Sequence, residues 1–285
     1  MIYLIGMSHG LSVIKAFDRN FATMDMEDFE EGRLNARPLP QTFEALQGTG
    51  ERPLLGGVKA FLIPRQRGWG EIVKVVENPA GGSPTIGVHR GFHALLAQIP
   101  RAPGTIVLSM LFGNEHSMMS IVEDDRPHDF VFPGRLDIAP LPGRQIVPWQ
   151  AVRRKLQHVL RPMAGVMLCL REALPEARLV HCAPPPPLES AEQILAATPH
   201  LLSDQLTKMG VTPASIRLKY YLAQLDELAQ LTGANRIGLL GPPPAALTAQ
   251  GLLRPELGRG ATHANAAYGG LVLDQLERWI EGGSA

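Results

Sequence analysis

Cysteine, long apolar runs and net charge are all scarce in this sequence. Its 285 residues include two cysteines, Cys169 and Cys182, both in apolar stretches, which favours free thiols and a reducing compartment. No run approaches the ~18 consecutive apolar residues of a membrane span, and the N-terminus lacks the basic start of a signal peptide. Lys plus Arg and Asp plus Glu number 27 each, so no overall charge attracts nucleic acid or an anionic membrane. We therefore expect a cytoplasmic protein with no nucleic-acid or membrane partner.

Apolar periodicity predicts the fold class. The composition, 45% apolar and 19% charged, is typical of a globular chain with a sizeable core. Five short apolar runs predict strands at 2–6, 58–63, 105–112, 177–183 and 236–240. Helical spacing occurs at 10–19, 90–99, 149–174, 189–197, 213–232 and 264–281. Apolar strands that alternate with helices predict one doubly wound α/β domain on a mostly parallel five-stranded sheet, with helices on both faces.

Three stretches interrupt this alternation, at 24–57, 64–88 and 121–148. They are rich in glycine, proline and polar residues, with one further strand candidate at 71–76. Loops of this length are uncommon unless they are functional or disordered. We expect them to be insertions that cover the carboxyl edge of the sheet, where substrate selectivity would be set.

Polar residues suited to chemistry gather in three loops. They are 6–10 (GMSHG) after the first strand, 112–117 (FGNEHS) after the third, and 262–269 (THANAAYG) at the last helix. Ligands of open α/β sheets bind beyond the carboxyl ends of the strands, so these loops can converge on one crevice. A serine hydroxyl needs a base, usually histidine, and the oxyanion that forms needs fixed donors. Ser8, His263 and Asn114 suit these three roles, although Ser8 also suits a helix N-cap and His263 a plain helix start.

The three loops, in this order, resemble the SGNH (GDSL-type) hydrolase superfamily. There the nucleophilic serine follows the first strand in a Gly-Asp-Ser turn, an asparagine lies in a Gly-x-Asn-Asp motif, and the base histidine lies in Asp-x-x-His near the C-terminus. The resemblance implies a flavodoxin-like single domain that hydrolyses esters with no metal or organic cofactor. It implies Ser8, His263 and Asn114 as catalytic residues and a small-molecule or carbohydrate acyl ester, with an acetyl group as one option, as substrate.

The chain departs from the family pattern at three positions. Met7 stands where the family has aspartate, and Gly113-Asn114-Glu115 lacks the spacer residue. The residue three before His263 is Gly260 instead of aspartate. Either His263 works in a dyad, oriented by a backbone carbonyl, or another acid substitutes, for which Glu256 is the nearest candidate in sequence.

Several residues around these loops are further candidates. Gly91 or Gly57 could supply the family's second oxyanion donor, and Gly113 borders Asn114. His9 and His116 flank the proposed site and could contact substrate. A zinc site formed by these two histidines and His263 is conceivable, but no HExxH or Cys/His spacing supports it.

Other readings of the glycine-rich first loop remain open. Gly6-x-Ser8-x-Gly10 matches the nucleophile elbow of α/β-hydrolases, but that elbow normally follows several strands and here follows the first. Strand, glycine turn and helix also suit a phosphate, but the loop is neither GxGxxG nor GxxxxGK[ST]. An O-acyltransferase would use the same serine and histidine. A non-catalytic protein that keeps the fold and binds a carbohydrate or protein partner is the remaining alternative.

Overall fold

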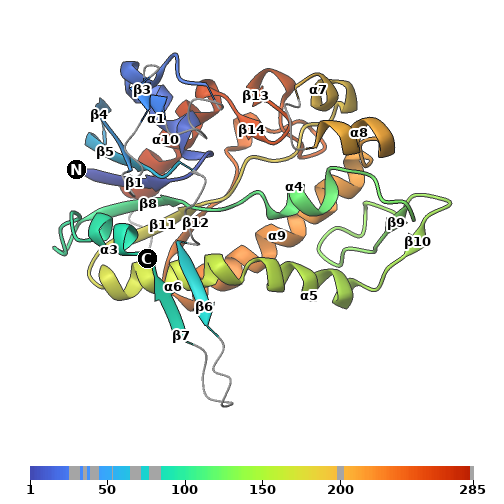
Figure 1. The fold of residues 1–285 in the computed structure, drawn as a ribbon, viewed down its shortest axis with the longest axis horizontal. Helices are drawn as coiled ribbons and strands as arrows, with labels where there is room; N and C mark the ends of the chain where they lie inside the picture. The colour runs from blue at the N-terminus through green and yellow to red at the C-terminus, as the bar shows by residue number, and fades with distance from the viewer. Residues whose placement is uncertain are drawn as a thin grey trace.

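A six-stranded sheet forms the centre of the protein (Figure 1). The structure is a computed structural model that describes residues 1–25, 33–34, 37–38, 45–52, 54–64, 72–76, 85–197 and 202–282. The sheet order is β12 (Gly238–Leu240), β11 (Arg178–Cys182), β8 (Ile106–Met110), β1 (Ile2–Gly6), β5 (Gly56–Leu62) and β4 (Leu46–Arg52). The first five are parallel and correspond to the five predicted strands. In chain order they run 2-1-3-4-5, the flavodoxin-like arrangement, so the predicted fold class is confirmed.

The sixth strand, β4, was not predicted and lies within the presumed insertion 24–57. It pairs antiparallel with β5 along all seven residues. Its sequence, LQGTGER, has few apolar residues because it is an edge strand. Gly48 and Gly50 face α1 (Gly10–Phe17), where an added Cβ would lie 2.3 Å from Ile14 Cδ1 and 2.4 Å from Phe17 Cδ2. The two glycines let the helix pack directly on the strand.

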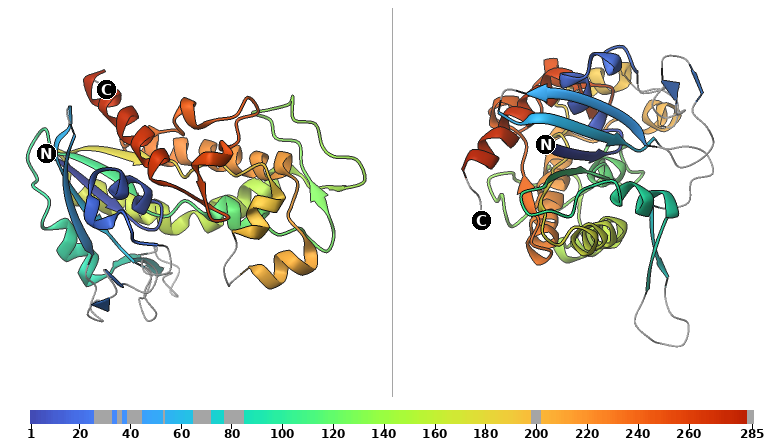
Figure 2. Two further views of the ribbon diagram at one scale, coloured as in Figure 1. Left: turned by 90° about the horizontal axis from the view of Figure 1, so that it is seen from above. Right: turned by 90° about the vertical axis from the view of Figure 1, so that its left-hand side faces the viewer.

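Helices cover both faces of the sheet (Figures 1 and 2). One face, with Leu4 and Leu108, packs on α1 and α10 (Ala266–Glu281). The other, with Ile5 and Val107, packs with residues of α3 (Arg90–Leu96), α6 (Arg161–Ala173) and α9 (Ala214–Ala234). Successive strand residues point to opposite faces, so strands buried on both sides are apolar at every position.

The remaining elements refine the predicted boundaries. The single helix predicted at 149–174 is two helices, α5 (Trp149–Val159) and α6, because Pro162 favours a new helix start after Leu160. Helix α7 (Ala191–Ala196) was predicted, whereas the short α4 (Glu115–Ser120) and α8 (Ser203–Met209) were not. Single turns occupy Arg19–Phe21, Pro244–Ala246 and Pro255–Leu257. Strand pairs are β2 (Arg33–Leu34) with β3 (Arg37–Pro38), β6 (Val73–Val76) with β7 (Thr85–Val88), β9 (His128–Asp129) with β10 (Gln145–Ile146), and β13 (Gly258–Arg259) with β14 (His263–Ala264).

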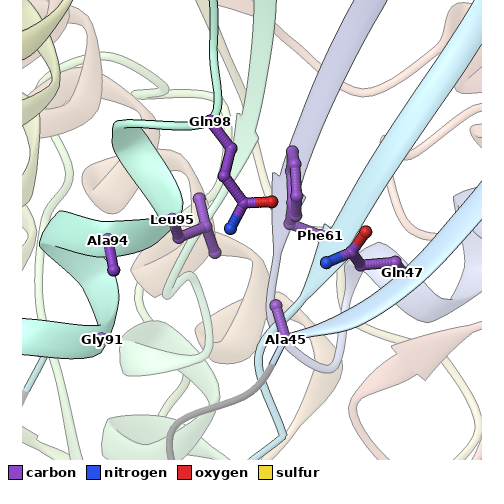
Figure 3. A pocket seen from close by; sticks show the side chains of 7 residues that line it. All are labelled: Ala45, Gln47, Phe61, Gly91, Ala94, Leu95 and Gln98. Carbon is purple, nitrogen blue, oxygen red and sulfur yellow. The ribbon is translucent and has the colours of Figure 1, made fainter.

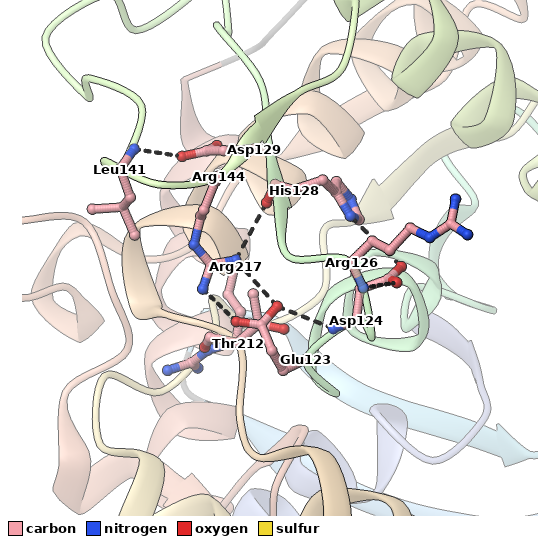
Figure 4. Close-up of polar contacts among 9 residues, drawn as sticks. All are labelled: Glu123, Asp124, Arg126, His128, Asp129, Leu141, Arg144, Thr212 and Arg217. Atoms are coloured by element: carbon pink, nitrogen blue, oxygen red, sulfur yellow. Dashed lines mark hydrogen bonds and ion pairs between the residues drawn. The ribbon is translucent and has the colours of Figure 1, made fainter.

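Residues 121–148, called the arm below, form an ordered extension beyond the carboxyl edge of the sheet (Figure 1). Its carboxylate Asp129 is fully buried, pairs with Lys219 of α9, and accepts from the N–H groups of Phe130 at 2.7 Å and Leu141 at 2.9 Å. Arg144 pairs with Glu123 and donates to the His128 carbonyl (Figure 4). Buried polar contacts therefore fix the arm to α9. Much of 24–57 and 64–88 lies outside the described residues.

The two cysteines are both free, with Cys182 buried and Cys169 partly exposed. His181 is buried in β11, with Nδ1 3.2 Å from Ser109 Oγ. Within the described ranges, no helix combines the length and apolar character that a membrane crossing requires.

Candidate active site

The three polar loops meet at the carboxyl ends of β1 and β8. The ring of His9, from the first loop, lies 4.9 Å from the ring of His263, from the last. The Asn114 amide, from the middle loop, is close enough to His9 to favour its protonated form. A Cβ built on Gly113 would lie 3.5 Å from the His9 ring. The structure therefore brings one member of each predicted loop to the same place.

Ser8 lies in the turn between β1 and α1. The turn is closed by Gly10 N–H donating to the Met7 carbonyl at 2.8 Å, and a Cβ on Gly10 would come within 2.7 Å of Leu62 Cδ2. The N-cap of α1 is His9, and no side chain caps this helix. The half-buried Ser8 hydroxyl makes no hydrogen bond to any residue that the structure describes, His263 included. Its hydroxyl is thus not used as a cap.

One ring nitrogen of His263 makes a hydrogen bond within the described residues and the other does not. Nδ1 lies 3.1 Å from the Thr262 hydroxyl, while Nε2 is buried without a hydrogen-bond partner. Burial, together with the neighbouring His9 and Arg259, lowers the pKa of His263 to about 3. The ring is neutral at pH 7, so one nitrogen keeps a lone pair that can accept a proton.

No carboxylate from the preceding segment orients His263. Glu256 pairs with Arg254, its side chain is 54% exposed, and it is not among the charges that shift the His263 pKa. Gly260, where the family has aspartate, has a φ of +65°, which favours glycine over any residue with a side chain. The Thr262 hydroxyl occupies the position at Nδ1 that an acid would take. Sequence reasoning missed Thr262 because it looked for carboxylates.

The Asn114 loop has an unusual backbone. Phe112 has a φ of +62° and Gly113 a φ of +126°, so two consecutive residues lie outside the regions that side chains favour. Asn114 follows at the start of α4 without capping it, and its Oδ1 is buried with no partner. Such strain persists only where surrounding contacts impose it, and it is commonly found at functional sites.

Gln224 of α9 supplies those contacts. Its Oε1 accepts from His116 N–H at 2.6 Å, and its Nε2 donates to the Gly113 carbonyl at 3.0 Å and to Glu115 Oε2 at 3.2 Å. Gly113 N–H donates to the same Glu115 oxygen at 3.0 Å, and burial raises the pKa of Glu115. The sequence gives no local signal for Gln224, which comes from a helix more than 100 residues away.

The two flanking histidines differ in what they contact. His116 is held by the Gly113 carbonyl and by Ser117 Oγ, each 3.1 Å from a ring nitrogen. Both nitrogens of His9 are buried and make no well-formed hydrogen bond within the described residues, although the Asn114 amide lies near this ring. Burial lowers the pKa of His9 to about 4 and that of His116 to about 3. Across the described part of the chain, no three His, Cys, Asp or Glu side chains are grouped to hold a metal ion.

The three candidate glycines either lie away from the proposed site or use their N–H groups in other hydrogen bonds. Gly91 N–H donates to His89 Nδ1 at 3.1 Å, and Gly91 lines a separate cavity of about 290 Å³ beside Phe61, with Gln47 and Gln98 at its sides (Figure 3). Gly57 lies at the amino end of β5, away from the carboxyl edge, because Val58 pairs with the first residue of β1. The N–H of Gly113 is taken by Glu115. A second oxyanion donor is therefore not provided by these glycines as they stand.

Comparison with known proteins gives only remote likenesses. No family model matches the chain, and no curated protein matches it. The periplasmic domain of a lipopolysaccharide acetyltransferase from Salmonella ser. Paratyphi A is 11% identical over 98% of this chain and 82% of that one, with a TM-score of 0.40. A "putative arylesterase" from Agrobacterium tumefaciens str. C58 is 14% identical over 99% of both chains, with a TM-score of 0.34. These values do not assign the chain to the family of either protein.

Proposed function

We propose that this protein is a serine esterase of the SGNH type that acts on a carboxylic ester with a small acyl group. The observation that carries the proposal is the meeting of Ser8, His263 and Asn114 loops around buried polar atoms that have no partner within the described chain. Burying an imidazole nitrogen and an amide oxygen without hydrogen bonds costs free energy. Both atoms are acceptors in the neutral ring and amide, so a substrate that brings hydrogen-bond donors, such as the hydroxyls of a carbohydrate ester, would satisfy them.

The reaction follows from the roles of these side chains. Ser8 Oγ attacks the ester carbonyl while its proton passes to His263 Nε2, and Asn114 with the Ser8 N–H binds the oxyanion. His263 then protonates the leaving alcohol, and water hydrolyses the acyl-serine by the same route. Thr262 accepts from Nδ1–H and so keeps the lone pair on Nε2. If an alcohol replaces water in the second half, the same site performs O-acyl transfer.

Covalent labelling tests this proposal directly. Purified protein would be treated with a fluorophosphonate, and its intact mass compared with that of Ser8→Ala and His263→Ala. We expect one adduct on the wild type, none on Ser8→Ala and slow labelling of His263→Ala. Ser12→Ala, in the same helix region but bonded to the His9 carbonyl at 2.8 Å, is the matched serine control. It should label as the wild type does.

The opposite result also has a clear meaning. Folded wild-type protein that takes no adduct between pH 6 and 9 would refute the esterase. It would favour the non-catalytic binding protein, a reading consistent with the lack of a Ser8–His263 hydrogen bond and of an orienting carboxylate among the residues that the structure describes. Adduct formation with ester turnover that rises when alcohols are added would favour the acyltransferase instead.

A further inference from the structure

Arg259 lies beside His263, and Lys15 lies near Arg259. Arg259 is directly opposite His263 in the β13–β14 pair, and opposite residues of an antiparallel pair project to the same side. Arg259 Nη2 lies 3.4 Å from the Met24 carbonyl, and Lys15 Nζ donates to that same oxygen at 2.5 Å. Because they share one acceptor, the two cationic groups are no more than about 6 Å apart.

The charges around this pair are unbalanced in the described residues. The pKa of Lys15 is lowered by burial and then by Arg259, and burial lowers that of Arg259. The carboxylate that acts on both cations is Asp25, which is exposed. Among the described residues, Arg259 thus borders a histidine that has only a neutral hydroxyl at Nδ1, and Lys15 adds a second positive charge near Arg259.

This arrangement is unfavourable for the proposed reaction when the substrate is neutral. Taking the proton of Ser8 makes His263 positive, beside Arg259 and without the acid that stabilises an imidazolium in a catalytic triad. Thr262 fixes the tautomer but brings no charge. A negative charge bound beside Arg259 would reduce this excess of positive charge and so lower the cost of the imidazolium.

We propose that the ester substrate itself carries an oxyanion, a carboxylate or phosphate, that binds Arg259 next to His263, with the nearby Lys15 adding to the attraction. This inference rests on the proposed esterase function. The substrate oxyanion stays ionised and takes no proton. Ser8 Oγ bonds to the carbonyl carbon, its proton goes to His263, and the alcohol leaves with that proton. The bound anion lowers the cost of the positive charge on His263 during the step.

Matched esters test the inference. We would compare kcat/KM for 4-acetoxybenzoate, its neutral methyl ester and 4-acetoxyphenyl phosphate in wild type, Arg259→Gln and Arg254→Gln. Arg254 carries the same charge nearby but is exposed and paired with Glu256, so it is the control. We expect the anionic-to-neutral ratio to fall about tenfold in Arg259→Gln and to change less than about twofold in Arg254→Gln. The phosphate ester distinguishes the two oxyanions.

A binding measurement separates failure of this inference from failure of the esterase. Imidazole NMR of Ser8→Ala, which cannot react, would follow the His263 signals during titration with inorganic phosphate. We expect phosphate to raise the pKa of His263, and to have no such effect once Arg259→Gln is added. If Ser8 is not labelled but phosphate still raises the pKa of His263, the esterase proposal is refuted and the anion site beside Arg259 stands. An unchanged ester ratio in an active Arg259→Gln enzyme, or His263 signals that phosphate does not move, overturns the anionic substrate.

Discussion

Acidification from pH 7.5 to 5.5 should sharply destabilise this protein because four histidines are held as neutral rings. His9, His116 and His181 are at most 5% exposed, and burial lowers their pKa values to about 4, 3 and 4. Burial likewise lowers the pKa of His263 to about 3. In the unfolded chain each would have a pKa of about 6.5. As pH falls below that value the unfolded state takes up protons that the folded state does not, so stability is lost as pH falls towards the folded pKa.

The size of the effect follows from this difference. At pH 5.5 each buried neutral histidine costs about 1.4 kcal/mol relative to the unfolded chain, and at pH 7.5 less than about 0.1 kcal/mol. Four such rings therefore lower the free energy of unfolding by roughly 5 kcal/mol over this interval. That is a large fraction of the total stability of a typical domain.

Urea unfolding at a series of pH values measures this loss. His181→Asn should reduce the slope by about a quarter, whatever it does to stability at pH 7.5, because one of the four rings is gone. His158→Asn, at an exposed position, should leave the slope unchanged. The raised pKa of Glu115 acts in the opposite direction but is common to all three proteins. A free energy of unfolding that is flat between pH 7.5 and 5.5, or a slope that His181→Asn does not change, would refute the reasoning.

Three further substitutions probe other features. Thr262→Val should lower kcat about tenfold and shift the pH profile, while Thr262→Ser should restore both, because the hydroxyl fixes the tautomer of the proposed base. Gly269→Ala should cost about 3 kcal/mol or more in urea unfolding, since its Cβ would lie 2.0 Å from a backbone oxygen of α1, whereas Gly270→Ala, with open space, should be tolerated. Lys219→Met should cost about 3 kcal/mol or more by leaving the Asp129 carboxylate buried without its cation, and adding Asp129→Asn should recover most of it.

The sequence was sufficient for the parallel part of the sheet. Strands buried on both faces are uninterrupted apolar runs, and this pattern identified all five. The sequence did not predict strand β4, because an edge strand needs no apolar run and its glycines resemble those of a loop. It also did not predict the helix break at Leu160, because the apolar spacing continues across Pro162 into the next helix.

The meeting of the three loops was predictable because it depends on strand ends, whereas contacts from distant helices were not. Ser8, Asn114 and His263 were named because each follows or precedes a recognisable element, and their catalytic roles stay a proposal. Gln224, which holds the Asn114 loop, and Thr262, whose hydroxyl lies at His263 Nδ1, carry no motif. Their roles come from the packing of α9 and from the turn at Gly260, neither of which has a sequence periodicity.

Helix α9 gives this site a thermodynamic property that its loops alone would lack. Through Gln224 it holds the Asn114 loop, through Lys219 it holds the arm, and through Tyr221, whose hydroxyl donates to the Pro184 carbonyl at 3.0 Å, it holds the segment after β11. These partners lie about 40 to 110 residues from α9 in the chain. The His116 N–H bonded to Gln224 cannot open to solvent unless α9 leaves the loop. Its hydrogen exchange should therefore be as slow as that of the central strands, so the loop would belong to the last part of the molecule to unfold.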